Sequence, residues 1–213
     1  MRIGVIGPGA MGEALSTRWL GSGHDLLLAG RTPEKAANVA AKIGAKHGSI
    51  SDAVSHGEVV LLAVRHEGAY ATLRDAGAER GAFRGKIIID CNNPVEVERF
   101  TLVTDGVTSM SERIQELAQG SNVVKAFNLC QAKVWGMQPP QFDGRPLAVP
   151  YCGDSAAAKS NVRSLIAELG CSPIDIGPLH RARHLEAMAA IVIGLLFTGY
   201  DSKTVFNLIT PPP

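Results

Sequence analysis

The stretch that decides the fold is Arg2-Ile3-Gly4-Val5-Ile6-Gly7-Pro8-Gly9-Ala10-Met11-Gly12, at the start of the chain. Its first part, Arg2–Ile6, is a short apolar run typical of a buried strand, and a helical stretch, Ala10–Leu20, follows. Three glycines with the spacing Gly-x-Gly-x-x-Gly stand where the expected strand turns into the expected helix. This placement is typical of the first unit of a dinucleotide-binding sheet.

Each of the three glycines has its own physical role. Gly7 allows the tight turn, Gly9 leaves room for a pyrophosphate to approach the backbone, and Gly12 lets the helix pack close to the sheet. The helix N-terminus then offers unpaired N–H groups and the positive end of a dipole to the phosphates. A glycine-rich turn without a ligand would not need all three glycines. We therefore predict that the dinucleotide lies on Gly7, Pro8, Gly9, Ala10, Met11 and Gly12.

Short runs of Val, Ile and Leu alternate with longer helical stretches along the rest of the chain. Further strands are expected at Asp25–Ala29, Val59–Val64, Lys86–Asp90, Asn122–Phe127, Leu147–Tyr151 and Pro173–Ile176. Further helices are expected at Pro33–Ile43, Glu67–Ala76, Ala156–Leu169 and Leu179–Tyr200, and loops at Pro94–Ser109 and Trp135–Pro146. The alternation predicts the α/β class, with a doubly wound, mostly parallel Rossmann sheet and a short C-terminal helical segment.

The predicted organisation has two parts. Residues 1–177 form the nucleotide-binding domain, and residues 178–213 form a C-terminal helix and tail, on the substrate side or in a dimer contact. The three prolines at 211–213 cannot extend a helix, so the tail is expected to be solvated. The last helix carries an apolar surface that predicts a homodimer, unless it packs on its own sheet. This surface consists of Ile191, Val192, Leu195, Leu196 and Phe197.

Composition excludes several function classes. With 213 residues, 46% hydrophobic and 19% charged, the chain is expected to form a compact soluble unit. Basic and acidic residues nearly balance, 21 against 20, and no basic run stands out, so no nucleic-acid partner is expected. The longest apolar stretch, Ala187–Gly199, is about half of a bilayer span, so we expect no membrane insertion and a cytoplasmic protein. The four cysteines lie far apart, which predicts buried thiols and no metal site.

The end of the second expected strand points to the preferred cofactor. An NAD enzyme places an Asp or Glu there to hold the adenosine ribose, but this chain has Arg31, Thr32 and Lys35 and no acid at the tip. A guanidinium can form charge-assisted bonds with a 2′-phosphate, which a threonine hydroxyl and a lysine would support. NADP is therefore favoured over NAD. The alternative is that Arg31 and Lys35 are ordinary solvent-exposed side chains at the start of a helix.

Three further strand ends are expected to meet the nicotinamide half, because ligands bind outside the carboxyl ends of the strands. Small side chains at Ala63 and Val64 would let the ring lie flat, and the carboxamides of Asn92 and Asn93 could form hydrogen bonds. The expected contacts are Ala63, Val64, Arg65, Asn92, Asn93, Pro94, Ala126 and Asn128, with Lys125 and Phe127 completing the wall. His66 is either a proton donor beside the nicotinamide or a surface or phosphate contact.

Several motifs together resemble the NADPH-dependent F-420 reductase (coenzyme F-420:NADP oxidoreductase) family. The motifs are Gly7–Gly12, Gly30-Arg31-Thr32, Asp90–Pro94, Val124–Asn128, Cys152-Gly153-Asp154 and Gly177–Glu186, and they span nearly the whole chain. The resemblance implies a Rossmann domain with a short C-terminal helical part, often dimeric, that moves a hydride between the nicotinamide and a stacked deazaflavin. That family is also similar to the cytoplasmic domain of membrane ferric reductases.

The chain departs from the family pattern on the acceptor side. Arg65 and His66 stand where the deazaflavin enzymes carry a Pro and an aromatic residue, and the Phe127–Trp135 region and the chain's end also differ. Candidate acceptors are therefore coenzyme F-420, a free flavin or a ferric chelate. A non-enzymatic NADP sensor is a further alternative. A sensor would bind NADPH without oxidising it in the presence of any of these acceptors.

Hydride transfer needs proximity and stacking of two rings more than an acid–base triad, and the sequence shows no such triad. We therefore name no catalytic residue. The small-molecule acceptor is expected between the Asn92–Pro94 and Phe127–Trp135 loops and the Arg181–Met188 face of the last helix. On that helix Arg181, Arg183 and His184 could hold an acidic tail, or Arg183 could instead form a helix-surface pair with Glu186.

Overall fold

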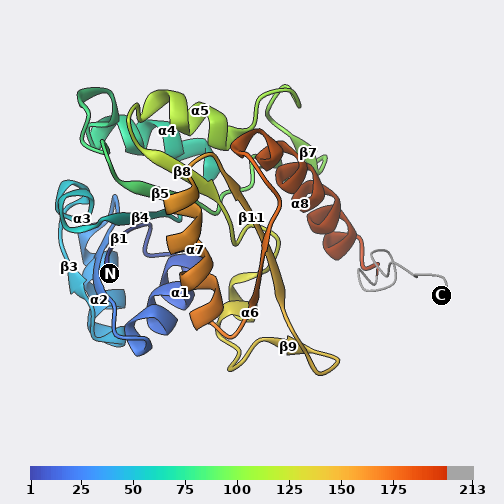
Figure 1. Cartoon of the computed structure of the whole chain (residues 1–213), viewed down its shortest axis with the longest axis horizontal. Coiled ribbons are helices and arrows are strands. Elements are labelled where there is room, and N and C mark those ends of the chain that lie inside the picture. Colours follow the sequence, from blue (N-terminus) through green and yellow to red (C-terminus); the bar gives the residue numbers. More distant parts are fainter. Residues whose placement is uncertain (201–213) are drawn as a thin grey trace.

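The central sheet has eight strands in the order β12-β11-β8-β5-β4-β1-β2-β3 (Figure 1). The computed structural model describes residues 1–200 of the chain. Strands β8 through β3 in this order run parallel, whereas β11 is antiparallel to β8 and β12 is parallel to β11. The strands are β1 (Arg2–Ile6), β2 (Asp25–Ala29), β3 (Lys46–His47), β4 (Val59–Leu62), β5 (Ile87–Asp90), β8 (Asn122–Lys125), β11 (Ala148–Gly153) and β12 (Ser172–Asp175). The predicted mostly parallel Rossmann sheet is confirmed.

Strand β1 lies between β2 and β4, so the chain moves to opposite sides of β1 as it adds strands. This is the topological switch point, where a crevice opens beyond the carboxyl ends of the strands. The glycine-rich turn after β1 therefore faces the crevice in which a ligand of such a sheet binds.

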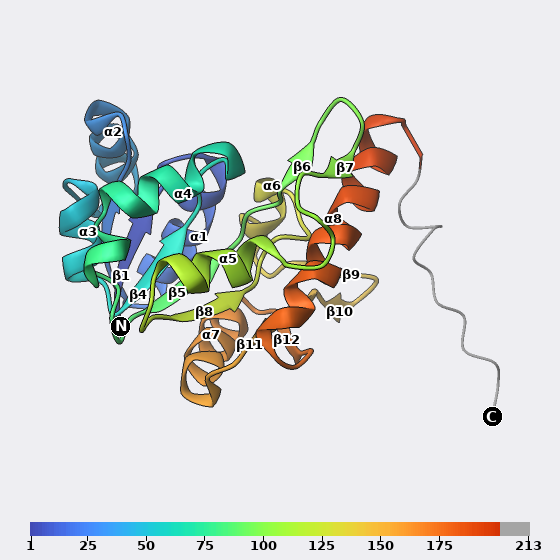
Figure 2. The same ribbon diagram turned by 90° about the horizontal axis from the view of Figure 1, so that it is seen from above.

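Helices cover both faces of the sheet. They are α1 (Ala10–Gly21), α2 (Pro33–Ile43), α3 (Ile50–His56), α4 (His66–Asp75), α5 (Met110–Leu117), α6 (Ala132–Trp135), α7 (Ala156–Glu168) and α8 (Ala182–Phe197). Figure 1 shows α4 and α5 above the strands and α1 on the opposite side, and the view from above in Figure 2 places α2 and α8 at opposite ends of the molecule. The doubly wound arrangement follows from strands that are apolar on both faces.

Two hydrophobic cores result, one on each face of the sheet. Val5 packs with α1 and α7 on one face, whereas Ile6 packs with α3, α4 and α5 on the other. Trp19 of α1 is fully buried, and its ring meets the edge of Phe127 at 5.8 Å between centroids. Phe127 in turn meets Trp135 at 5.3 Å, so these aromatic rings hold α1 and α6 together beneath the sheet.

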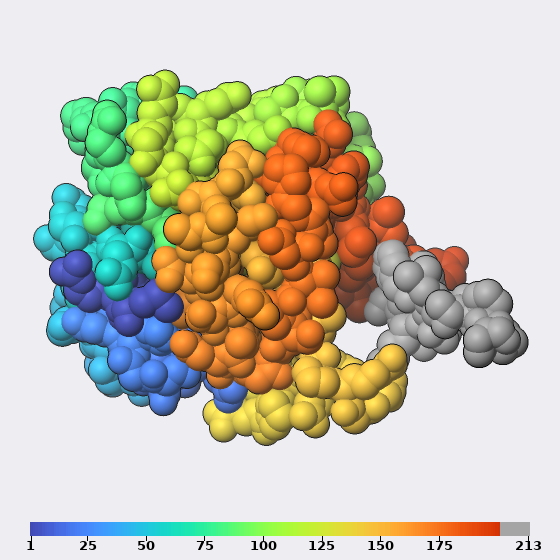
Figure 3. Space-filling model, in the orientation of Figure 1, coloured from blue at the N-terminus to red at the C-terminus, as the bar shows by residue number. Residues whose placement is uncertain are grey.

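Both segments expected to be loops contain short hairpins. Strands β6 (Val95–Glu96) and β7 (Thr101–Leu102) pair within the first, and β9 (Gln141–Phe142) and β10 (Arg145–Pro146) pair within the second. The second hairpin, yellow in Figure 3, projects from the body of the molecule. Hairpins with two residues in each strand have too little hydrophobic alternation to be recognised from sequence.

The C-terminal segment begins with a short 3-10 turn, Leu179–Arg181, and continues as α8. Ile191 is 56% exposed and Phe197 is 69% exposed, so the end of the helix presents apolar side chains to solvent. The homodimer and the division at residue 177 stay predictions, and the tail with its three prolines lies outside the described residues. Within residues 1–200, no helix combines the length and apolar character that a bilayer crossing requires.

Candidate functional site

The glycine-rich turn has the tight geometry that its sequence predicts. Gly7 has a φ of +116°, and a Cβ atom there would lie 2.2 Å from the carbonyl oxygen of Ala63. A Cβ on Gly12 would lie 2.1 Å from the carbonyl oxygen of Gly7. Both positions therefore require glycine for packing. Gly9 is different, because a Cβ there would meet no atom within 4 Å and would point into open space above the turn.

The start of α1 is open to an anion. Gly9 is the N-cap residue and has no side chain to bond the free N–H groups of the first helical turn. Those N–H groups and the helix dipole together favour a phosphate. Gly30, at the end of β2, completes the floor of the site, because a Cβ on it would lie 2.5 Å from the Pro8 Cδ atom.

A first cavity of about 230 Å³ extends from this turn to the end of β2. Arg31, Thr32 and Lys35 lie on its rim, exposed to solvent. The Arg31 guanidinium reaches across towards α4, since a Cβ on Gly68 would lie 3.8 Å from the Arg31 Nη1 atom. Thr32 is the N-cap residue of α2, but its hydroxyl makes no capping bond and stays available to a ligand.

A second cavity of about 340 Å³ adjoins the first and shares Ala63, Val64 and Arg65 with it. Its walls come from the ends of β4 and β5, from the β6–β7 hairpin and from α8. The remaining lining residues are Met11, His66, Glu67, Cys91, Asn92, Asn93, Val95, Val97 and Ile193. We call this second cavity the acceptor pocket. None of Arg181, Arg183 and His184 lines either cavity.

Asn92 and Asn93, which line the acceptor pocket, and Asn128, which does not, bond mainly to the protein itself. The Asn92 Nδ2 atom donates to the Leu62 carbonyl oxygen (3.1 Å) and to Asp90 Oδ1 (2.8 Å). Asn93 and Asn128 bond to each other, with Asn128 Nδ2 donating to Asn93 Oδ1 at 2.9 Å. Their amide N–H groups thus shape the wall of the pocket, and direct contacts of these residues with a cofactor stay predictions.

The rim of the acceptor pocket carries charges. Arg65 Nη2 lies 2.9 Å from Glu67 Oε1, in an ion pair whose arginine side chain is 81% exposed. The hydrogen bond from Arg65 holds the pKa of Glu67 below its usual range. His66 Nδ1 lies 3.6 Å from the same carboxylate, so this histidine faces Glu67 at the start of α4. Cys91 is not a nucleophile here, because burial raises the pKa of its thiol to about 12.

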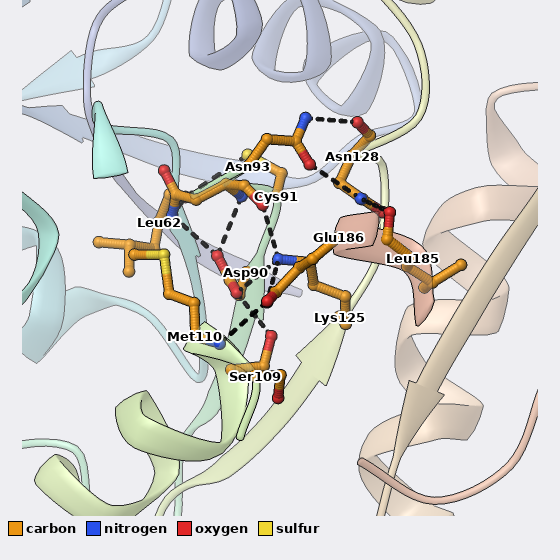
Figure 4. Close-up of polar contacts among 12 residues, drawn as sticks. Leu62, Asp90, Cys91, Asn93, Ser109, Met110, Lys125, Asn128, Leu185 and Glu186 are labelled. Atoms are coloured by element: carbon orange, nitrogen blue, oxygen red, sulfur yellow. Dashed lines mark hydrogen bonds and ion pairs between the residues drawn. The ribbon is translucent and has the colours of Figure 1, made fainter. Parts of the chain in front are cut away.

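Behind the wall lies a fully buried cluster of three charges, Asp90, Lys125 and Glu186 (Figure 4). Lys125 Nζ donates to Asp90 Oδ2 (2.9 Å), to the Asn92 carbonyl oxygen (2.6 Å) and to Glu186 Oε1 (3.2 Å). Ser111 Oγ donates to Asp90 Oδ2 at 2.6 Å, and the Met110 N–H donates to Glu186 Oε2 at 3.1 Å. The cluster therefore joins the ends of β5 and β8 to α5 and α8.

The three pKa values of the cluster shift in directions that follow from its charge balance. Burial favours a neutral Asp90, but Lys125 and hydrogen bonds from Ser111 and Asn92 outweigh it and hold the pKa of Asp90 below its usual range. Burial favours a neutral Lys125 too, but the two carboxylates outweigh it and raise its pKa. Burial and the charge of Asp90 raise the pKa of Glu186, because one ammonium serves two carboxylates.

The cluster corrects one of the two interpretations of the last helix. Arg183 and Glu186 do not form a helix-surface pair, since Glu186 is fully buried and Arg183 Nη1 instead donates to the Val107 carbonyl oxygen at 3.2 Å. Arg181 and His184 are exposed. Spacing alone suggested the local pair, whereas the buried face of α8 decides where Glu186 points.

Comparison with known proteins shows which families this chain resembles. Residues 2–94 match the family model described as NADP oxidoreductase, coenzyme F420-dependent. The F420-dependent NADP reductase of Methanocaldococcus jannaschii is 28% identical over 95% of this chain and 95% of its own length. Over residues 2–94 the chain is therefore similar to this NADP oxidoreductase family. The family match ends at Pro94, so it covers the glycine-rich turn and Arg31 and stops before Lys125 and α8.

Other similar proteins have names that indicate different activities. Metalloreductase STEAP3 of Rattus norvegicus is 33% identical over 88% of this chain, but the chain spans only 36% of that protein. A crystal structure from Arthrobacter sp. FB24, named provisionally as an F420-dependent NADP reductase, has a TM-score of 0.84 and 27% identity. It covers 94% of this chain and 96% of its own. A reductive aminase from Aspergillus terreus, solved in complex with NADPH, shares the fold with a TM-score of 0.67. It is 22% identical in sequence, and the match covers 93% of this chain and 63% of the aminase chain.

Proposed function

We propose that the chain transfers a hydride from NADPH to a deazaflavin acceptor of the coenzyme F-420 type. The observation that carries the proposal is the pair of adjoining cavities that share Ala63, Val64 and Arg65. One cavity has the features of a dinucleotide site, and the other is a mainly apolar pocket directly beside it. The family relation supports NADP as the cofactor, and the nearly full-length F420-dependent relative supports the acceptor.

The residues of the first cavity fit NADP. The uncapped start of α1 and the open space above Gly9 suit a pyrophosphate. Arg31, Thr32 and Lys35 then suit a 2′-phosphate, because a guanidinium, a hydroxyl and an ammonium are all donors to its oxygens. Within the described residues, no carboxylate is ion-paired with Arg31 or Lys35, so their charges are available.

The residues of the acceptor pocket fit a flat ring. NADPH supplies the hydride when it is bound, and the chain has to hold both rings face to face and keep water away. Ala63 and Val64 are small enough to leave one ring face open, while Val97 and Ile193 give the pocket apolar walls. The reduced acceptor takes its proton from solvent or from a group that lines the pocket, such as the His66 imidazole.

A second candidate function is reduction of a ferric chelate or a free flavin. It is favoured by the 33% identity to a metalloreductase, although this chain spans about a third of that protein. Within residues 1–200, no group of three or more His, Cys, Asp and Glu side chains is placed to bind a metal ion. A ferric acceptor would therefore enter as a chelate substrate.

The test is a titration of the purified protein with NADPH and with NADH, followed by addition of coenzyme F-420, FMN or a ferric chelate. Selective NADPH binding and rapid loss of deazaflavin absorbance support the proposal. Turnover only with FMN or the ferric chelate supports the second candidate. NADPH binding without turnover of any acceptor supports a sensor and refutes both enzymatic proposals.

A further inference from the structure

The buried Asp90–Lys125–Glu186 cluster has no obvious role in stability. Burying three charges is costly, and neutral or apolar side chains of similar size often stabilise a protein as well or better. A buried ionic cluster does, however, fix the relative position of the elements that carry it, because each charge has few favourable arrangements. The role of the cluster therefore depends on which parts of the acceptor pocket these elements carry.

On the sheet side the cluster holds the turn that follows β5. Lys125 Nζ bonds the Asn92 carbonyl oxygen, and Asp90 Oδ1 accepts bonds from the backbone N–H (3.0 Å) and side chain of Asn92. The same turn presents Asn92 and Asn93 to the acceptor pocket. One wall of the pocket is thus held from behind by Lys125 and Asp90.

On the helix side the cluster holds α8. Glu186 bonds Lys125, and the carbonyl oxygen of its neighbour Leu185 accepts a bond from Asn128 Nδ2 at 3.0 Å. Ile193 follows Glu186 by two helical turns, so both lie on the same face of α8. Ile193 lines the acceptor pocket together with Val64 and Asn93. Beyond this point the outer half of α8 meets the β6–β7 hairpin, where the rings of Phe197 and Phe100 lie 5.6 Å apart between centroids.

We propose that Lys125 is a positioning residue for hydride transfer: by bonding the Asn92 carbonyl oxygen and Glu186 together, it sets the distance between the two walls of the acceptor pocket. Lys125 touches neither cavity and acts through these two residues. The inference rests on the proposed function, because it assigns that pocket to the acceptor. Loss of Lys125 is expected to slow hydride transfer strongly, since a displacement of about 1 Å caused by a change far from the chemistry can slow a reaction about a hundredfold.

The test uses the triple variant Lys125→Met, Asp90→Asn and Glu186→Gln, which replaces all three charges with neutral groups of similar shape and avoids an unpaired buried charge. The matched control is Lys86→Met. Lys86 is a partly buried lysine that donates to the Gly57 carbonyl oxygen at 2.7 Å, at the opposite ends of the strands. The measurements are the Kd of NADPH, kcat and KM with coenzyme F-420, and amide hydrogen exchange along the chain.

For the triple variant we expect kcat with coenzyme F-420 to fall about 10- to 100-fold, while the Kd of NADPH changes by about twofold or less. Exchange should rise about tenfold or more in residues 92–93 and 185–197 and stay unchanged elsewhere. The Lys86→Met control should show neither effect. Unchanged turnover in the triple variant, or faster exchange throughout the chain, would overturn the proposal.

The exchange measurement also separates this inference from the proposed function. If the unmodified protein does not reduce coenzyme F-420, the proposed acceptor is wrong. The localised rise in exchange would then still support Lys125 as the residue that positions α8 against the turn after β5. Exchange in residues 185–197 equal to that of the control would refute it.

Discussion

Replacing Arg31 with Ala should weaken NADPH binding far more than NADH binding. The Arg31 side chain is exposed and makes no ion pair within the described residues, so its removal should leave the fold intact. Its guanidinium lies on the rim of the first cavity, at the end of β2, where the 2′-phosphate of NADP is expected. The substitution therefore removes a ligand contact and little else.

The magnitude follows from the type of contact that is lost. A hydrogen bond to a charged group contributes about 1.5–3 kcal/mol, which corresponds to a roughly 10- to 150-fold rise in the Kd of NADPH. NADH lacks the 2′-phosphate and should lose only stacking of the guanidinium on the adenine, a change of about fivefold or less. Fluorescence titration with both nucleotides measures the two effects. Arg163→Ala, an exposed arginine on α7 away from the cavity, is the control.

Equal losses for NADPH and NADH would refute the reasoning, because the 2′-phosphate would then not be the group that Arg31 recognises. A large loss of thermal stability would also contradict it, since the exposed side chain has no structural partner.

The remaining predictions concern the turn, a thiol, the core and acid stability. Gly9→Val should abolish NADPH binding in calorimetric titration with little change in Tm, because Gly9 has an extended backbone (φ −92°) and open space beside it; retained affinity would refute the phosphate site. Ellman's reagent at about pH 8 should leave Cys91 unmodified in the folded protein, since burial raises its pKa to about 12; rapid labelling would show an accessible thiol. Trp19→Ala should lower the free energy of unfolding in urea by about 3–5 kcal/mol, whereas the exposed Val103→Ala should change it by about 0.5 kcal/mol or less. Asp90 has a lowered pKa in the folded protein, so its ionised form stabilises the fold above its usual pKa, and this contribution is lost as the pH falls. In the Asp90→Asn variant the free energy of unfolding should therefore fall less steeply below about pH 4 than in the unmodified protein. Parallel pH profiles for the two proteins would contradict this.

Local sequence patterns predicted the sheet and the nucleotide half of the site. The run Arg2–Ile6 and the three glycines after it interact mainly with neighbours in the first strand–turn–helix unit, so their spacing carries the information. Helices α3 and α5 were not predicted, although each starts with a readable signal. Ser49 with Asp52, and Ser109 with Glu112, form capping boxes in which each side chain bonds the other's backbone N–H.

The acceptor side could not be predicted as well, because it depends on contacts between distant residues. Lys125 and Glu186 are 61 residues apart, and no local pattern connects them. The spacing of Arg183 and Glu186 allowed a surface pair as readily as a contact with an acidic tail, as it does on any exposed helix. Only the packing of α8 against α5 and the ends of the strands buries Glu186 and brings Ile193 to the acceptor pocket.

The most direct test of the account is a single turnover with NADPH that carries deuterium at the transferred position and with coenzyme F-420 as acceptor. Mass spectrometry of the product then reports whether the hydride itself has moved. We expect the reduced deazaflavin to carry the deuterium when NADPH is the donor, and we expect far less reduced deazaflavin when NADH is the donor. Deazaflavin that stays oxidised, or that is reduced without the label, would contradict it.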